Sequence, residues 1–280
     1  MSTRSAIILA GACLLAALPS AAQMRDNSEK QLDCRGNRGG RDARFCEVRE
    51  QSMAASPSLH VDPGTNGGLQ VKGWSRGDVL VRARVDAWAA DDSRAKSIAS
   101  QVKVIAQAGR VYAEGPSNLN REGLSVSFEI FTPHKTGVSG KAHNGGLTLS
   151  DLDGAIDVAT TNGGLHFTRL AGKVKGTTTN GGVHIELDGD RWNGDSLDVR
   201  TTNGGVHVQM PDNYNALLEA GTTNGGMHLG FPVTVTGEIG KRISTKIGAG
   251  GALLRFSTTN GGVHIGKAGA QASRRKQRSV

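Results

Sequence analysis

The chain has 280 residues, a formal net charge of +8 and 40 glycines, about 14% of its residues, roughly twice the usual glycine share. Aromatic residues make up only 4% of the chain, which excludes a core built on large aromatic side chains. So much glycine with so few aromatics predicts many tight turns between short strands. The length allows one large domain or two small ones.

Residues 1–22 have the pattern of an export signal. Arg4 supplies the basic start, Ala6 to Leu18 form an apolar run, and Ser20-Ala21-Ala22 is a small-residue cleavage site. The run is too short to span a bilayer permanently, and no second run of that kind follows. The sequence therefore predicts an exported chain without a transmembrane segment, which is periplasmic, associated with the outer membrane or secreted.

Three cysteines are present, and one of them, Cys13, would leave with the signal. A faint lipoprotein-like box that ends at Cys13 makes lipidation an alternative. Cys34 and Cys46 remain in residues 23–56, a basic leader that lacks apolar periodicity and is predicted to be flexible. In an oxidising compartment this pair is expected to form a disulfide, the alternative being two free thiols. A metal site on two cysteines would need further ligands nearby, and the leader offers none.

Residues 57–140 are predicted to be a β-rich cap region with one helix. Apolar residues alternate with polar ones at Leu59-His60-Val61, from Val79 to Val85 and from Leu124 to Ile130, which is the period of a strand. Ala89 to Ala99 is the expected helix, because Asp91, Asp92 and Ser93 can cap it and Ala95, Ile98 and Ala99 form an apolar stripe.

Residues 141–266 are dominated by a repeat whose fuller form is Thr-Thr-Asn-Gly-Gly-Val-His. Its spacings are 18, 18, 23, 21 and 36 residues after the copy at 144, and we expect the longest gap to contain a rung without the motif, near Ile243 to Ile247. The two outermost copies, at 66 and 144, are degenerate, as capping repeats are. Residues 267–280 are predicted to be a basic, disordered tail. The repeat corners begin at Asn66, Asn144, Asn162, Asn180, Asn203, Asn224 and Asn260.

Each repeat is predicted to be a strand, an Asn-Gly-Gly corner and a second strand. Asn followed by Gly tolerates positive φ, which explains the corner. The alternation in Val183-His184-Ile185 places the histidine outside and its two neighbours inside. Two all-β architectures fit: an antiparallel array of hairpins, or a parallel β-solenoid in which equal residues stack. We favour the solenoid, because only stacking rewards the same polar residue at the same place in every unit.

The most unusual feature is a histidine that recurs at one position of the repeat. One hypothesis is a periplasmic divalent-metal-binding protein, in which neighbouring imidazoles hold zinc or copper. The other interpretation, which we favour, is a ladder of stacked polar rings on the surface. In either case, charging several stacked rings is repulsive, so we expect the repeat to loosen in acid. The five residues are His166, His184, His207, His228 and His264.

Other chemistry has weaker support in the sequence. Parallel solenoids can host carbohydrate-active enzymes, and clusters such as Asp151 with Asp153 and Asp188 with Asp190 could bind calcium or act as an acid pair. Turn aspartates are common for backbone reasons, however, and the usual motifs for hydrolases, zinc proteases and phosphate-binding loops do not occur. No catalytic residue and no cofactor site is therefore assigned, and specific nucleic-acid binding is not expected because the three tryptophans are scattered.

The repeat units, Val71-Lys72-Gly73-Trp74 and Arg191-Trp192-Asn193-Gly194 together resemble the bacterial putative-adhesin family, a domain of unknown function made of β-strand repeats. The resemblance covers roughly residues 58–266 and implies an exported repeat domain without known catalysis. We therefore expect a non-catalytic module of the bacterial envelope, an adhesin or a structural protein, that binds an envelope or extracellular polymer or protein. Its basic ends either contact an anionic surface or are simply solvated.

Overall fold

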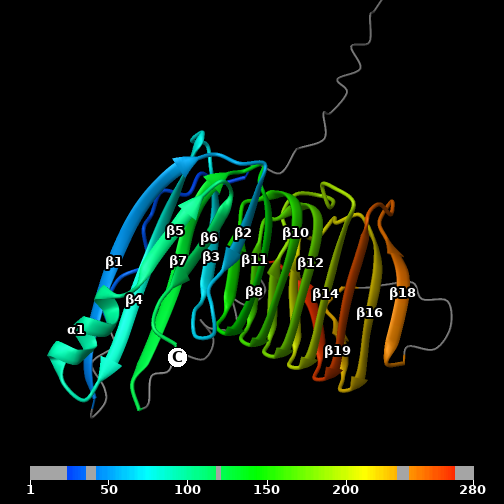
Figure 1. Cartoon of the computed structure of the whole chain (residues 1–280). Coiled ribbons are helices and arrows are strands. Elements are labelled where there is room, and N and C mark those ends of the chain that lie inside the picture. Colours follow the sequence, from blue (N-terminus) through cyan, green and yellow to red (C-terminus); the bar gives the residue numbers. More distant parts are fainter. Residues whose placement is uncertain (1–23, 36–41, 118–120, 232–239, 269–280) are drawn as a thin grey trace, which may run out of the picture.

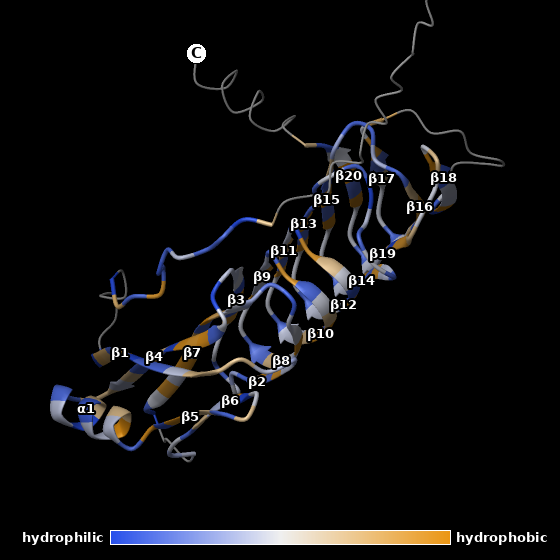
Figure 2. Cartoon of the chain, turned by 90° about the horizontal axis from the view of Figure 1, so that it is seen from above, coloured by the Kyte–Doolittle hydropathy of each residue, from blue (hydrophilic) through white to orange (hydrophobic). Residues whose placement is uncertain are grey.

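The computed structural model describes residues 24–35, 42–117, 121–231 and 240–268, which form two ten-stranded sheets that face each other (Figure 1). We call them sheet A, in the order β1-β4-β7-β3-β9-β11-β13-β15-β20-β17, and sheet B, in the order β18-β16-β19-β14-β12-β10-β8-β2-β6-β5. Seen from above, the strands stand in two rows (Figure 2). Buried apolar residues from both sheets form one core cluster. The export signal, Cys13 and the basic tail from residue 269 lie outside the described residues.

The repeats build a parallel β-solenoid, so the preferred architecture is confirmed and the hairpin array is wrong. In each rung one strand lies in sheet B and the next in sheet A, and equal positions of the motif pair across rungs, as His184 does with His166 and His207. The rungs are β8 (Gly137–Asn144) with β9 (Leu147–Ser150), β10 (Asp153–Asn162) with β11 (Leu165–Thr168), β12 (Ala171–Asn180) with β13 (Val183–Glu186), β14 (Ser196–Asn203) with β15 (Val206–Met210), β19 (Leu253–Asn260) with β20 (Val263–Lys267), and β16 (Ala216–Asn224) with β17 (Met227–Leu229).

The last rung in the sequence is not the last in space. β19 pairs with β14 on one side and β16 on the other, so the rung of residues 253–267 lies between two rungs that precede it in the chain. We had expected the 36-residue gap to contain an additional parallel rung near Ile243 to Ile247, and the described residues of the gap show that this is wrong. Its strand, β18 (Arg242–Ile247), runs antiparallel to β16 and covers the edge of sheet B at this end of the stack.

The degenerate copy at Asn66 forms a true rung. Its strands β2 (Ser58–Asp62) and β3 (Leu69–Trp74) pair in parallel with β8 and β9. The cap lies beyond this rung: β7 (Gly123–Pro133) and β4 (Asp78–Ala89) extend sheet A, and β6 (Arg110–Glu114) and β5 (Lys103–Gln107) extend sheet B. The predicted helix is confirmed as α1 (Asp92–Ser100), with the Asp91 side chain accepting from the Arg94 amide and with Ala95, Ile98 and Ala99 buried.

The leader is not the flexible segment that its composition predicts. Its second half is β1 (Ala43–Ala54), a strand of 12 residues that pairs antiparallel with β4 along its whole length. Apolar periodicity is absent because polar side chains of β1 take part in its packing by donating to carbonyl groups of the cap backbone. Arg49 donates to the carbonyl oxygen of Ala99 at 2.9 Å, and Gln51 donates to that of Val104 at 3.1 Å.

The first half of the leader, residues 24–35, lies along the outer face of sheet A, and we call it the N-terminal strap. Two buried carboxylates hold it. Glu129 accepts hydrogen bonds from the amides of Gln31 and Leu32 at 2.9 and 3.1 Å, besides its ion pair with Lys72 at 2.8 Å. Asp151 accepts from the amide of Arg25 at 2.9 Å.

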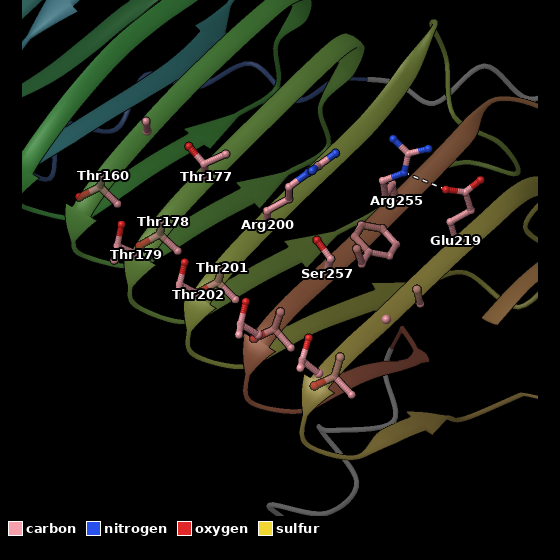
Figure 3. A pocket seen from close by; sticks show the side chains of 18 of the residues that line it. Thr160, Thr177, Thr178, Thr179, Arg200, Thr201, Thr202, Glu219, Arg255 and Ser257 are labelled. Carbon is pink, nitrogen blue, oxygen red and sulfur yellow. Dashed lines mark hydrogen bonds and ion pairs between the residues drawn. The ribbon is translucent and has the colours of Figure 1, made fainter. Parts of the chain in front are cut away.

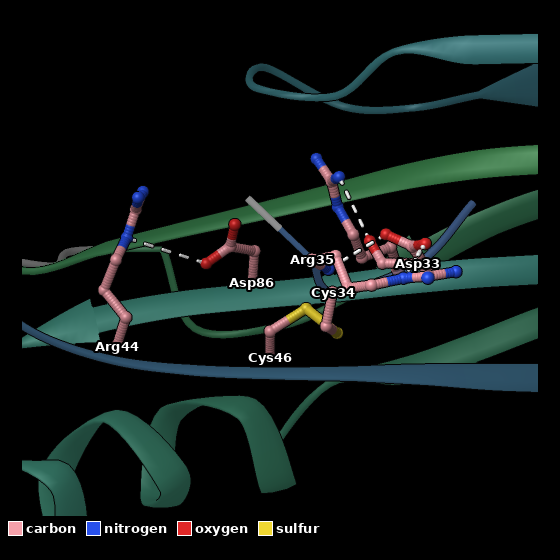
Figure 4. Close-up of a disulfide and its surroundings, with 7 residues drawn as sticks. Asp33, Cys34, Arg35, Arg44, Cys46 and Asp86 are labelled. Atoms are coloured by element: carbon pink, nitrogen blue, oxygen red, sulfur yellow. Dashed lines mark hydrogen bonds and ion pairs between the residues drawn. A yellow bond between two sulfur atoms is a disulfide. The ribbon is translucent and has the colours of Figure 1, made fainter. Parts of the chain in front are cut away.

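The predicted disulfide is present and closes the far end of the strap. Cys34 of the strap is bonded to Cys46 of β1, with an S–S distance of 2.03 Å (Figure 4). The bond thus joins the strap covalently to the outermost strand of sheet A.

Candidate binding surfaces of the repeat

The asparagines of the corner form a continuous ladder along the stack. Each side-chain amide donates to the carbonyl oxygen of the next one at 2.7–2.9 Å. None of these asparagines has positive φ, so the turn-based reason for the motif is wrong. The ladder order is Asn66, Asn144, Asn162, Asn180, Asn203, Asn260 and Asn224, which is the spatial order of the rungs.

The first glycine of the motif is required by close packing between rungs. A Cβ atom on Gly181 would lie 2.0 Å from the carbonyl oxygen of Gly163, and one on Gly163 would lie 2.1 Å from that of Gly145. No real Cβ atom approaches a carbonyl oxygen that closely, so only glycine fits while the rungs keep their spacing. Gly261 has the same close contact, 2.1 Å to the carbonyl oxygen of Gly204, and is the only glycine of the repeat corners that also has a positive φ, 154°.

The first threonine of the motif is buried. It donates a hydrogen bond to the carbonyl group of the first glycine in the neighbouring rung. Thr178 is 5% exposed, and its Oγ1 donates to the carbonyl oxygen of Gly163 at 2.8 Å. The equivalent threonines make the same bond in four other rungs, namely Thr160, Thr201, Thr222 and Thr258. The corner motif is therefore explained by structure, and its remaining surface groups are the second threonine and the histidine.

The five predicted histidines form one ladder on the outer face of sheet A, as expected. Ring centroids are 4.9 Å apart between His166 and His184, 5.1 Å between His184 and His207 and 5.2 Å between His207 and His264, with planes within 11° of parallel. His228 ends the row, tilted by 41° against His264 at 5.6 Å. Toward the cap, Thr148 and then Gln70 occupy the same register position.

The stack disfavours protonation of its rings. Partial burial lowers the pKa of His166 below the usual 6.5, and the nearby His184 lowers it further. Burial also lowers the pKa of His207, which lies between His184 and His264. The surroundings of the ladder therefore favour neutral rings.

A groove crosses the outer face of sheet B on the other side of the corner, and we call it the threonine groove (Figure 3). It has a volume of about 1170 Å³ and is lined by β8, β10, β12, β14, β19, β16 and β18. One row of its residues comes from the same register position in successive strands: Lys141, Ala159, Thr177, Arg200, Ser257 and Gly221. A second row, beside the corner, is the exposed or half-buried second threonine of each repeat: Thr161, Thr179, Thr202, Thr259 and Thr223.

Charged side chains of β14, β19 and β16, in the middle and toward one end of the groove, hold one another in place. Arg200 donates to Asp198 through Nε at 3.0 Å and Nη2 at 2.9 Å. Arg255 donates to Glu219 at 2.8 Å and lies 3.5 Å from Asp198. Burial alone would raise the pKa of Asp198, but the two arginines outweigh it and hold this pKa below its usual value. The two guanidinium groups thus stay charged and oriented at the groove.

A family model described as Toastrack DUF4097 matches residues 67–266, more than half of the chain. The chain belongs to the Toastrack DUF4097 family. The match begins at Gly67, in the corner of the first rung, and extends to Gly266 in β20. It confirms the resemblance to a putative-adhesin domain of unknown function. No curated protein matches this Toastrack chain.

The solved structures to which the Toastrack domain is similar have low sequence identity to it. A putative cell adhesion protein from Clostridium sporogenes is 11% identical, with a TM-score of 0.42, and the likeness covers 79% of this chain and 100% of that one. A putative adhesin from Bacteroides fragilis is 12% identical, with a TM-score of 0.36, and the likeness covers 78% of this chain and 97% of that one. A putative adhesin from Parabacteroides distasonis is 10% identical, with a TM-score of 0.35, and the likeness covers 78% of this chain and 97% of that one.

The metal hypothesis for the five histidines gains no support from the described residues of the Toastrack domain. Among the residues that the structure describes, no group of three or more His, Cys, Asp or Glu side chains is placed to hold a metal ion. Parallel rings also direct their in-plane nitrogen lone pairs along parallel lines, which do not meet at one ion. The metal hypothesis stays a prediction, to be tested by titration with zinc.

The turn aspartates of the domain have structural partners. Asp151 is fully buried and receives two hydrogen bonds of 2.7 Å from Arg169 besides those from the strap. Asp190 pairs with the neighbouring Arg191, and Asp157 lies 3.8 Å from Lys175. In the described part of the chain these carboxylates form ion pairs in the second turn of the rungs and on the outer face of sheet B.

Sequence reasoning missed the threonine groove. The signal was present in the strands before each corner, where Thr177, Arg200 and Ser257 occupy outward positions. These residues differ from one another, so no repeat of identity drew attention to them. Only the order of the strands in the Toastrack domain shows that they form one row. In the described residues no helix is both long and apolar enough to cross a membrane.

Proposed function

We propose that this Toastrack domain is an exported, non-catalytic binding module of the bacterial envelope, of the adhesin type, whose threonine groove holds an extended polymer. The observation that carries the proposal is the course of the groove, which runs across seven neighbouring strands of sheet B instead of ending in a closed pocket. A surface that repeats from rung to rung suits a ligand that also repeats. Its hydroxyl and charged side chains can bind such a chain along its length.

Export is supported by the signal pattern of residues 1–22 and by the Cys34–Cys46 disulfide, which belongs to an oxidising compartment. The absence of catalysis is supported by the structural roles of the aspartates described above. The similar structures from Clostridium sporogenes and Bacteroides fragilis are named a putative cell adhesion protein and a putative adhesin.

The test is retention of the mature chain, residues 23–280, on immobilised polysaccharides and on purified peptidoglycan. Ser257 lines the groove in the row that also contains Thr177 and Arg200. Ser257→Trp therefore fills the groove without altering the inward face of β19. Thr168→Trp is the matched control, because Thr168 lies on the outer face of sheet A. We expect at least one polymer to retain the wild type and the control but not Ser257→Trp. Equal retention of all three proteins, or of none, contradicts the proposed site.

A further inference from the structure

The geometry points to an acidic polysaccharide as the occupant of the threonine groove; this inference rests on the proposed function and names its ligand class. Four cationic side chains line the groove and only one carboxylate does: Lys141, Arg200, Arg242 and Arg255 against Glu219. An excess of fixed positive charge in a hollow raises the local concentration of anions.

The arginines keep donors available for a ligand. A guanidinium group has five N–H donors. Arg200 uses Nε and Nη2 toward Asp198, and Arg255 uses Nε toward Glu219 and Nη1 toward Asp198. Both side chains are more than one third exposed, at 55% and 38%. Asp198 therefore acts as a positioning residue that orients the guanidinium groups of Arg200 and Arg255. Their remaining N–H groups can bind a carboxylate or sulfate.

The charges are too far apart for a small anion. Lys141 lies on β8 and Arg242 on β18, which are six strand steps apart in sheet B, or about 29 Å at the usual strand spacing. Neither side chain has an ion pair within the described part of the chain. Arg200, on β14, and Arg255, on β19, lie between them. A ligand that meets all four cations must therefore be a chain with several acidic groups.

The neutral surface between the cations favours a sugar chain over other polyanions. The second threonine of five repeats, together with Thr177 and Ser257, offers hydroxyl groups that can pair with sugar hydroxyls. Nucleic-acid strands bind through stacking on exposed aromatic rings, and the only aromatic residue that lines the groove, Phe256, is fully buried. An added peptide strand would lie along a free sheet edge. The groove instead runs across the strands, and of its seven lining strands only β18 is at an edge of sheet B, whereas β14 and β19 are paired on both sides.

The experiment measures affinity of the disulfide-bonded mature chain for alginate, which carries carboxylates, and for dextran sulfate, with unmodified dextran, poly-dT and polyglutamate as comparisons. We expect at least tenfold tighter binding of an acidic polysaccharide than of dextran, poly-dT or polyglutamate, and weaker binding as salt rises from 50 to 300 mM (assay conditions). The alginate and dextran sulfate arms decide between a carboxylate and a sulfate partner. Arg200→Gln with Arg255→Gln should reduce the affinity at least tenfold.

The matched control is Arg76→Gln with Arg94→Gln, two exposed arginines of the cap that also pair with carboxylates, Asp78 and Glu122. It should bind within twofold of wild type, and thermal melts establish that both double variants are folded. Equal binding of dextran overturns the acidic class but leaves the proposed function. Equal binding of poly-dT or polyglutamate overturns the assignment to a polysaccharide. No binding of any polysaccharide overturns the inference and the proposed function together.

Discussion

The hydroxyl group of Thr178 donates a 2.8 Å hydrogen bond to the carbonyl oxygen of Gly163, one rung away, and this bond recurs through the stack. Thr178→Val keeps the shape of the buried side chain but leaves the half-buried carbonyl group of Gly163 without this donor. A buried polar group left unpaired costs about 1–3 kcal/mol. We expect a loss of this size in the free energy of unfolding, measured by urea denaturation.

Thr179→Val is the control for this prediction. Thr179 is the next residue, carries the same side chain and is exposed. The same substitution there should change the free energy of unfolding much less. Equal losses for the two variants would mean that strand propensity, and not the bond to Gly163, determines the effect.

The first glycine of the corner should be the least replaceable residue of the repeat. In Gly181→Ala the new Cβ atom would lie 2.0 Å from the carbonyl oxygen of Gly163, so two rungs must move apart. Overpacking of this kind costs about 1–3 kcal/mol and sometimes more. We expect a loss at the upper end of that range. Gly226→Ala is the control, because nothing lies within 4 Å of its added Cβ, and a similar loss there would contradict the packing argument.

Acid should weaken the attachment of the N-terminal strap. Burial raises the pKa of Glu129, but hydrogen bonds from Lys72 and from the amides of Gln31 and Leu32 outweigh it and hold the pKa below its usual 4.5. The folded state thus binds fewer protons than the unfolded state, so the stabilisation is complete above the usual pKa and is lost as the pH falls through the folded value. We expect the urea midpoint to fall steeply between about pH 5 and pH 3.

Glu129→Gln tests the source of that pH dependence. The variant leaves Lys72 and Arg82 without their buried carboxylate, and removing one partner of a buried pair costs about 3–5 kcal/mol. The variant should be less stable at neutral pH and lose less on acidification than the wild type. Glu122→Gln, at an exposed ion pair with Arg94, should leave the profile nearly unchanged. An unchanged slope in Glu129→Gln would assign the acid sensitivity to other groups.

The sequence predicts those parts of the fold that repeat. Alternation in segments such as Val183-His184-Ile185 gives the strands and their faces, and equal polar residues at equal positions favour parallel stacking. The outward histidines and the Cys34–Cys46 pair follow from the same reasoning. Local patterns are sufficient here because each rung buries its alternate residues against the equivalent residues of the adjacent rungs.

The rest depends on partners far away in the sequence. The copies at Asn203, Asn224 and Asn260 are nearly identical locally, so their sequence does not reveal that the last of them stacks between the other two. The amide of Gln31 is held by Glu129, which lies 98 residues away. The threonine groove exists only once the order of the strands is known, so local patterns could not predict it.

The histidine ladder should behave as a coupled system in acid. His184 lies between His166 and His207 and lowers the pKa of both, in addition to the effect of their burial. In His184→Gln this contribution is removed, so we expect the pKa of His166 and of His207 to rise, as followed by NMR titration of the ring protons. The control variant is His60→Gln, on the outer face of sheet B, which should leave the pKa of His166 and of His207 unchanged.

The same ladder sets a direction for stability. Because the pKa of His166 and His207 is lower in the folded state than the usual 6.5, the unfolded state binds protons first as the pH falls below that value. The wild type should therefore become less stable between about pH 7 and pH 5, above the range in which Glu129 titrates. His184→Gln should reduce this loss. A midpoint that is the same at pH 7 and pH 5 in both proteins would show that stacked, neutral rings do not contribute to stability.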